Sequence, residues 1–430
     1  MKKRYILKYF LILTTLFVLL LLAILIPDSR IREHTTGSSK YFLKHRLFER
    51  EYADREYAVV DNLADCYLIS VLCGIDVSEN KLRAIFMAPY YQDENRNINE
   101  SLAVALKEKL LPNQSYARYW HGGIIFVKPL LLFGDIVFVR RAIGALLFLA
   151  FGAVLLLNIL YRQYAFAGIY LIGCVFLRFS YVSKCVEYAI PILLLNMVML
   201  ILTIRMRKCG KTFDMPGFML LSGCIVSFFD FLTVETLFFT VRYFYYISVR
   251  SDKLFPVKEQ FAAAKKSELK ALLLSGISFI NSYAMTFLVK WGICALLDKS
   301  SFPLVWRQVM VRVRERTLAG ALENNIKLLL HPGGKLPDSY MAVYAALFLL
   351  LLFGVIAATY GMKNLRLFMM GLLALIPYLR YAVLKNHSRY HYFFTYRAQL
   401  IVCMFLLFCI FDILLRLRKR FLLHHRGCSS

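Results

Sequence analysis

The chain begins with a basic cluster, which is followed by an apolar run from about residue 6 to residue 26. A helix needs about 20 apolar residues to cross the hydrocarbon core of a bilayer, so a run of this length fits one span. The run is too long for the apolar core of a signal peptide, and no small-x-small cleavage site follows it. We therefore expect an uncleaved first membrane span whose N-terminus lies in the cytoplasm.

Apolar runs with short connections recur along the rest of the chain. Hydrophobic residues make up 59% of the sequence, and the mean hydropathy of +0.58 is too high for a soluble protein. The sequence predicts an all-α polytopic membrane protein with about ten transmembrane helices. After the first span, the predicted spans cover residues 141–160, 165–179, 189–204, 215–228, 237–249, 272–296, 341–360, 367–384 and 399–415.

The distribution of charge predicts the orientation of these spans. The formal net charge is +26, and the Lys and Arg residues flank the apolar runs. Basic loops of this kind face the cytoplasm and its anionic lipid surface. We therefore expect both termini in the cytoplasm, with membrane lipids rather than nucleic acid as the partner of the basic residues.

Two long connections between the predicted spans lie on the outer side. Within the first of them, residues 120–139 are apolar but are interrupted by His121, Lys128 and Asp135, which predicts a helix along the outer membrane surface. The predicted regions are a first span (1–26), an outer loop with interfacial helices and candidate catalytic acids (27–140), a transmembrane bundle (141–296), a second outer loop (297–338), C-terminal transmembrane helices (339–415) and a basic cytoplasmic tail (416–430).

With this orientation, unusually polar segments meet on the outer side of the membrane. Ionisable groups at membrane depth are costly and indicate a functional site. The convergence of acidic and basic sets favours an acid–base step beside an anionic group. The segments cover residues 49–67, 115–123, 180–188, 228–236, 306–316 and 385–397.

Asp61 and Asp65 are the leading acids of the first outer loop. Their i, i+4 spacing places both carboxylates on one face of a helix. Two neighbouring carboxylates raise each other's pKa and can divide the roles of base and metal ligand. The alternative is an ordinary solvated helix face.

A second acidic pair lies in a tight turn between two predicted spans. Asp230 either caps the helix that follows or enters a cavity. Glu235 lies five residues later at the start of that helix, where an acid favours the helix N-terminus.

The segment 385–397 is cationic and aromatic and contains no carboxylate. His387 and His391 have a spacing that can bind zinc, but no third ligand is near, and the flanking Arg389 disfavours a cation. Phosphate fits better, because Arg makes charge-assisted hydrogen bonds to phosphate oxygens and His adds a donor. Arg397 completes this phosphate set, and interfacial anchoring is the alternative. Further site candidates are Arg118, His121 and Lys184.

A multi-spanning chain with a long acidic outer loop after its first helix resembles the GT-C membrane glycosyltransferases. The stretch VDNLADCY (60–67) occupies the place of that family's catalytic loop. ARYWHGGIIFVKPLLLF (117–133), FFDFLTVET (228–236) and NHSRYHYFFTYR (386–397) resemble motifs of bacterial multi-pass proteins placed near that superfamily. The resemblance implies a GT-C-like helical bundle, a polyprenyl-phosphate sugar donor, a lipid or glycan acceptor, and a role in cell-envelope glycan synthesis.

The mechanism that the resemblance implies assigns roles to both residue sets. Asp61 is the best candidate for the base that removes a proton from the acceptor hydroxyl, and the cationic set stabilises the departing lipid phosphate. The family's loop often carries adjacent acids, whereas Asp61 and Asp65 are four residues apart, so the identity of the base stays open. No cofactor is indicated with certainty, and a divalent cation stays open too.

Two other functions fit parts of the same pattern. A transporter or flippase of an anionic lipid-linked glycan needs the cations without the acids, although it would line a central path with polar residues. Here the middles of the spans are mostly apolar, with Asn196 and Asn281 as exceptions. A glycan polymerase or ligase is the second alternative, and it does not require an acidic pair after the first span.

Overall fold

The computed structural model describes residues 3–53, 55–209, 212–250, 261–313, 318–330, 348–356 and 365–427. The described chain is almost entirely helical, and its strands form only two small two-stranded sheets. Six helical segments are long and apolar enough to cross a membrane, which confirms the prediction of an all-α membrane protein. These segments are Tyr5–Ile24, Ile136–Leu160, Val186–Cys209, Ala264–Leu297, Leu365–Val383 and Tyr392–Leu415.

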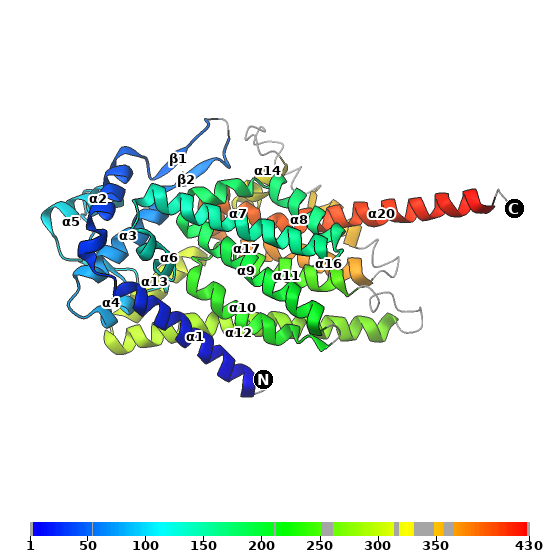
Figure 1. Ribbon diagram of the computed structural model, residues 1–430, viewed down its shortest axis with the longest axis horizontal. Coiled ribbons are helices and arrows are strands. Elements are labelled where there is room, and N and C mark those ends of the chain that lie inside the picture. Colours follow the sequence, from blue (N-terminus) through cyan, green and yellow to red (C-terminus); the bar gives the residue numbers. More distant parts are fainter. Residues whose placement is uncertain are drawn as a thin grey trace.

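The long helices form a bundle that runs along the long axis of the molecule (Figure 1). Helix α20 continues past the bundle, so residues up to Gly427 of the predicted tail 416–430 extend the last helix. The bundle helices are α1 (Lys3–Ile24), α7 (Ile136–Leu160), α8 (Tyr164–Phe176), α9 (Val186–Cys209), α10 (Met215–Phe229), α11 (Glu235–Val249), α12 (Phe261–Leu297), α16 (Leu365–Ala374), α17 (Ile376–Val383) and α20 (Leu400–Gly427).

The predicted count of about ten spans stays a prediction. Helices α8, α10 and α11 coincide with predicted spans but have only 13, 15 and 15 residues. Of the predicted span 341–360, residues 348–356 are described and the rest lies outside the described residues.

Close approach of α10 and α12 depends on a glycine. A Cβ atom built at Gly223 would lie 2.4 Å from the carbonyl oxygen of Phe279, so any side chain there would force the helices apart. The hydroxyl of Ser227 donates to the carbonyl oxygen of Tyr283 at 3.0 Å one turn further along. These contacts fix the register of the two helices.

The predicted outer loop 27–140 is a folded cap at the end of the bundle opposite the C-terminus (Figure 1). Leu68, Ile69, Val71 and Leu72 are buried at its centre on one helix. The cap contains α2 (Asp28–Lys44), β1 (Phe48–Arg50), β2 (Val59–Asp61), α3 (Asn62–Val77), α4 (Lys81–Met87), β3 (Pro89–Tyr90), α5 (Ile98–Glu108), β4 (Gln114–Ser115) and α6 (Ile124–Leu130).

Residues 120–139 differ from the predicted surface helix. His121 has a φ of 57°, which places it in the left-handed region, and the short helix α6 follows it. Asp135 then caps α7 by accepting the backbone N–H of Val137 at 3.0 Å, so α7 begins at Ile136, before the predicted start at 141. Lys128 is fully buried and pairs with Asp76. Of the three polar residues that indicated a membrane surface, His121 and Lys128 are therefore internal, and Asp135 is half-buried at a helix cap.

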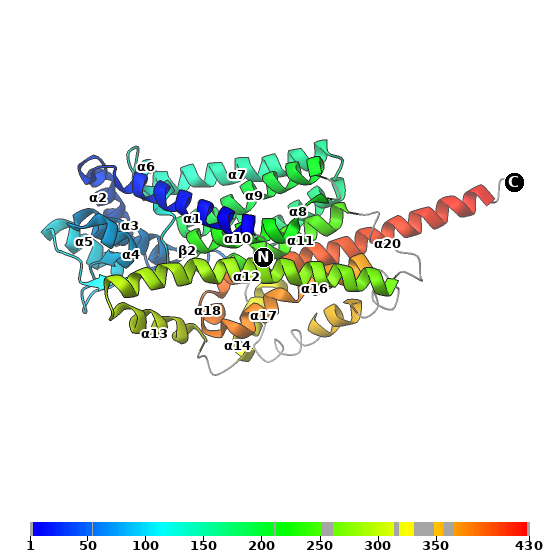
Figure 2. The ribbon, with the colours of Figure 1, turned by 90° about the horizontal axis from the view of Figure 1, so that it is seen from below.

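The second half of the chain adds short helices beside the cap and the bundle. Figure 2 shows α13, α14, α17 and α18 on one side of α12. The segment 385–397 folds into short helical turns. The remaining elements are η1 (Phe179–Lys184), α13 (Ser301–Val313), α14 (Leu318–Leu330), α18 (Lys385–Tyr390), α19 (Tyr392–Thr395) and η5 (Tyr396–Gln399).

Candidate functional site

Asp61 lies at the junction of β2 and α3 and is 1% exposed. One carboxylate oxygen caps α3 by accepting the backbone N–H of Ala64 at 2.9 Å, and the other accepts the hydroxyl of Tyr188. Burial raises the pKa of Asp61 to about 6, although these hydrogen bonds act in the opposite direction.

Asp65 occupies a different environment, although it is only four residues away. Its carboxylate accepts the Arg140 guanidinium at 2.7 Å and the backbone N–H groups of Val186 and Glu187 at 3.1 and 3.2 Å. The side chain thus holds the N-terminus of α9 against α3 and α7 and does not line the cavity that contains Asp61. The shared helix face expected from the spacing is absent, because Asp61 caps the helix instead of lying within it.

Glu187 brings a further carboxyl group to the site from the first turn of α9. The side chain is 4% exposed, and its Oε1 has no hydrogen-bond partner among the described residues. The next residue, Tyr188, stacks on Phe394 with ring centroids 3.8 Å apart. The acid is therefore held on a rigid, closely packed turn.

Three cationic or ionisable nitrogen groups lie opposite these acids. Arg118 is held by Gln308 at 2.9 Å and by the hydroxyl of Tyr116 at 2.8 Å, with its guanidinium over the Tyr116 ring. His387 and His391 lie one helical turn apart, with ring centroids 4.8 Å apart. All three side chains approach the same cavity from different parts of the chain.

These groups line a cavity of about 260 Å³, which we call the polar cavity. Its walls combine two carboxyl groups, three nitrogen-bearing side chains and several aromatic rings. Such a mixture can orient a polar ring, move a proton and bind an anionic group. The lining residues are Asp61, Leu63, Ala64, Tyr67, Tyr116, Arg118, Tyr119, Glu187, Tyr188, Phe231, Thr233, His387 and His391.

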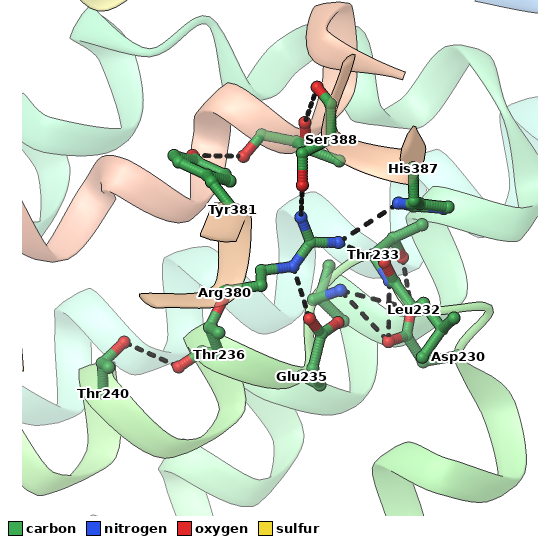
Figure 3. A network of polar contacts seen from close by, with 12 residues as sticks. Asp230, Leu232, Thr233, Glu235, Thr236, Thr240, Arg380, Tyr381, His387 and Ser388 are labelled. Atoms are coloured by element: carbon green, nitrogen blue, oxygen red, sulfur yellow. Dashed lines mark hydrogen bonds and ion pairs between the residues drawn. The ribbon is translucent and has the colours of Figure 1, made fainter. Parts of the chain in front are cut away.

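Arg380 lies among Glu235, Ser388 and His387 (Figure 3), and His387 in turn lines the polar cavity. The Arg380 guanidinium pairs with Glu235 and donates to Ser388 Oγ at 3.1 Å. It also contacts the carbonyl oxygen of Leu232, and one nitrogen lies 3.4 Å from His387 Nδ1. This buried arginine is thus in direct contact with a wall of the polar cavity.

Arg380 and Glu235 also line a second cavity of about 570 Å³, which we call the apolar cavity. They are its charged lining residues, and most of the other lining side chains, from α11, α12, α16 and α17, are hydrophobic. A long apolar chain fits such a lining. The lining residues are Glu235, Thr236, Phe239, Leu272, Leu273, Gly276, Ile277, Phe279, Ile280, Tyr283, Leu372, Ile376, Leu379, Arg380, Val383 and Leu384.

Asp230 is a cap and not a lining residue of either cavity. Its carboxylate accepts the backbone N–H groups of Thr233 and Val234 at 3.0 and 3.1 Å and therefore holds the start of α11. Burial, together with the nearby charge of Glu235, raises the pKa of Asp230 to about 7. Asp230 thus shapes the loop that separates the two cavities.

Other predicted site residues lie outside both cavities. The imidazole of His121 contacts the Tyr116 carbonyl oxygen at 3.0 Å, and burial lowers its pKa well below the ordinary value. Lys184 pairs with Glu51 at 2.9 Å, and Arg389 is exposed. Arg397 is buried, and its guanidinium donates to the carbonyl oxygen of Phe393 at 2.8 Å. Of the predicted phosphate set, the structure brings together His387 and His391.

Two residues of the site carried signals that the sequence analysis did not use. Arg380 is a single arginine within the apolar run 367–384, and a charged residue within a span indicates function. Glu187 belongs to the polar segment 180–188, but its position relative to Asp61 depends on the packing of α9 against α3. Among the described residues, no three His, Cys, Asp or Glu side chains are grouped so that they could hold a metal ion.

Comparison of the chain with protein-family models, with curated proteins and with solved structures found no match in any of the three.

Proposed function

We propose that the chain is a membrane glycosyltransferase that moves a sugar from a polyprenyl-phosphate donor to an acceptor hydroxyl. The observation that carries this proposal is the polar cavity, where Asp61 and Glu187 lie with Arg118, His387 and His391. A carboxylate accepts the proton of the attacking hydroxyl, and cationic groups stabilise the phosphate that leaves. Both requirements of glycosyl transfer are thus met within one small space.

The size and lining of the polar cavity suit a sugar. A volume of about 260 Å³ accommodates one monosaccharide unit with part of an acceptor. Tyr67, Tyr116 and Phe231 offer ring faces and edges on which the C–H groups of a sugar can pack.

The apolar cavity supports a lipid-linked donor. It lies between membrane helices, and its charged lining residues are Arg380 and Glu235. A polyprenyl chain placed there would bring its phosphate to Arg380 and His387, directly beside the polar cavity. The sugar would then enter the polar cavity, where the acids lie.

The positions of basic residues support the orientation in the membrane that we propose. We place the cap and the polar cavity on the outer side and both termini in the cytoplasm, because basic residues flank the opposite ends of the apolar runs. In this orientation the enzyme acts in the synthesis of a cell-envelope glycan or glycolipid.

The proposal is tested by expressing the wild type and two double variants in a bacterial host and measuring glycolipids and surface glycans by mass spectrometry. We expect a product one hexose or pentose heavier with the wild type. It should be lost in Asp61→Asn/Glu187→Gln, which removes both acids, and in Arg118→Ala/His387→Ala, which removes cations. Glu108→Gln, at an exposed position on α5, serves as the control.

The alternatives predict different outcomes. A flippase or a ligase needs the cations and not the acids. If the double acid variant keeps the product while the double cationic variant loses it at equal protein level, the glycosyltransferase proposal is wrong.

A further inference from the structure

We infer that Glu187, and not Asp61, removes the proton from the acceptor hydroxyl; this inference rests on the glycosyl transfer proposed above. Both side chains line the polar cavity. They differ in what already occupies their oxygens, and this difference decides between them.

Both carboxylate oxygens of Asp61 already accept hydrogen bonds that hold the fold together. One accepts the N–H of Ala64 and caps α3, and the other accepts the hydroxyl of Tyr188. Burial makes Asp61 more basic than an exposed aspartate, but a proton from the acceptor hydroxyl would have to compete with the donors that already occupy both of its oxygens. The bond to Tyr188 makes Asp61 a positioning residue for the start of α9.

The other carboxylates near Glu187 also accept hydrogen bonds or ion pairs that hold the fold together. Asp65 binds Arg140 and the N-terminus of α9, and Asp230 caps α11. Among the acids that line the polar cavity in the described part of the chain, Glu187 is the one with an oxygen that no donor occupies.

The backbone of Glu187 is fixed on both sides, although its carboxyl group has this free oxygen. Its N–H donates to Asp65 at 3.2 Å, and the following residue, Tyr188, is held by Asp61 and by stacking on Phe394. A catalytic base needs this combination of a fixed position and an available lone pair.

The proposed step is balanced. The acceptor oxygen forms a bond to the anomeric carbon of the sugar while its proton passes to the Glu187 carboxylate. The bond between the anomeric carbon and the phosphate oxygen breaks, and its electron pair stays on the lipid phosphate. The products are the glycoside, the lipid phosphate and protonated Glu187, which then loses the proton to water.

The test uses the purified full-length protein in nanodiscs, with an undecaprenyl-phosphate-linked hexose or pentose that the wild type consumes and a bacterial envelope extract that provides the acceptor hydroxyl. We expect Glu187→Gln to lower kcat by about 100-fold or more, the usual contribution of a general base. Asn at position 61 keeps one oxygen that can cap α3, and its amide NH2 can donate to the Tyr188 hydroxyl, which reverses the direction of that hydrogen bond. Asp61→Asn should therefore lower kcat by less than about tenfold. Undecaprenyl phosphate binding, measured by native mass spectrometry, should stay within about twofold in Glu187→Gln, because the acid acts on the acceptor and not on the phosphate.

The outcomes separate this inference from the proposed function. If Asp61→Asn loses 100-fold or both single variants lose equally, the assignment to Glu187 is overturned while glycosyl transfer stands. If neither variant nor the double variant changes turnover, both are overturned. If Glu187→Gln does not fold, Glu187→Asp is used instead, because it keeps the charge but moves the carboxylate back by one methylene. We expect its kcat to be at least about tenfold lower with KM unchanged. A normal kcat in this variant would overturn the assignment.

Discussion

Asp65 and Arg140 form a buried ion pair, with the guanidinium Nε 2.7 Å from the carboxylate, between α3 and α7. Arg140 also donates to Asn62 at 2.8 Å and to the hydroxyl of Tyr41 at 3.0 Å. The same carboxylate accepts N–H groups at the start of α9. The pair therefore ties the cap to two bundle helices and fixes the turn that carries Glu187.

Removing Arg140 should destabilise the protein strongly. Arg140→Met leaves Asp65 buried without its cation, and we expect the free energy of unfolding to fall by about 3 to 5 kcal/mol. Lys184→Met provides the control, because Lys184 is half-exposed and pairs with Glu51 at the surface, where a pair contributes about 0 to 1 kcal/mol. Unfolding in detergent, followed by circular dichroism, measures both. Equal losses in the two variants would contradict the structural role of Asp65.

The titration of Asp61 should make stability depend on pH. Burial raises the pKa of Asp61 from 3.8 to about 6 in the folded protein. Between these values the folded state binds more protons than the unfolded state, so the contribution of Asp61 is present below pH 3.8 and is lost as the pH rises through about 6. The expected loss is about 3 kcal/mol.

Asp61→Asn removes the titration of Asp61 and leaves the other titrating groups in place. The difference between the wild type and the variant therefore reports on Asp61 alone. The free energy of unfolding of the wild type minus that of the variant should fall by about 2 kcal/mol between pH 4 and pH 7.5, because part of the full loss already occurs below pH 4. Unfolding of both proteins at the two pH values measures this quantity. A difference that is constant or that rises with pH would show that Asp61 is not desolvated as the structure indicates.

Arg380 should bind the lipid phosphate in competition with Glu235. Arg380→Lys replaces the planar guanidinium, which can donate two hydrogen bonds to one phosphate, by a single ammonium group. Undecaprenyl phosphate binding should weaken by about tenfold, or about 1.4 kcal/mol. Glu235→Gln removes the competing carboxylate and should tighten binding. Native mass spectrometry with undecaprenyl phosphate gives both affinities, and weaker binding in Glu235→Gln would contradict a phosphate site at Arg380.

The apolar cavity can be filled without disturbing the bundle. A Cβ atom built at Gly276 meets only Phe239 Cζ, at 3.7 Å, so Gly276→Leu places its side chain in the cavity. We expect undecaprenyl phosphate binding to fall at least about tenfold, because the polyprenyl chain is excluded while the thermal stability is kept. Gly292→Leu on the same helix has nothing within 4 Å of the new Cβ and should bind as the wild type does. Unchanged binding in Gly276→Leu would place the lipid elsewhere.

The sequence predicts the helices well, because span length and apolar composition are local properties of the chain. The apolar runs around residues 6–26, 141–160 and 189–204 all coincide with long helices of the structure. The interior of the cap was not predictable in this way. Lys128 and His121 look like surface residues in the sequence, and only the fold supplies the carboxylate and carbonyl oxygens that allow their burial.

The candidate site could also be predicted only in part from the sequence. The spacing of Asp61 and Asp65 suggested one helix face, but a strand ends at Asp61 and the helix starts after it, so the two carboxylates have different partners. Glu187 lies more than a hundred residues away in sequence, and its place beside Asp61 depends on tertiary packing. Arg380 was recognisable as a lone charge in an apolar run, whereas its contacts with Glu235 and His387 were not.

The most direct test of glycosyl transfer is the release of lipid phosphate. Purified protein in nanodiscs is supplied with undecaprenyl-phosphate-linked hexose or pentose and with a bacterial envelope extract that provides the acceptor hydroxyl. Free undecaprenyl phosphate and new glycoside are both measured by mass spectrometry. The account predicts that the wild type releases undecaprenyl phosphate together with an equal amount of new glycoside, and that Asp61→Asn/Glu187→Gln releases neither. If the wild type releases no undecaprenyl phosphate in nanodiscs but moves the intact lipid-linked sugar across the bilayer of sealed liposomes, the protein is a transporter and the account is wrong.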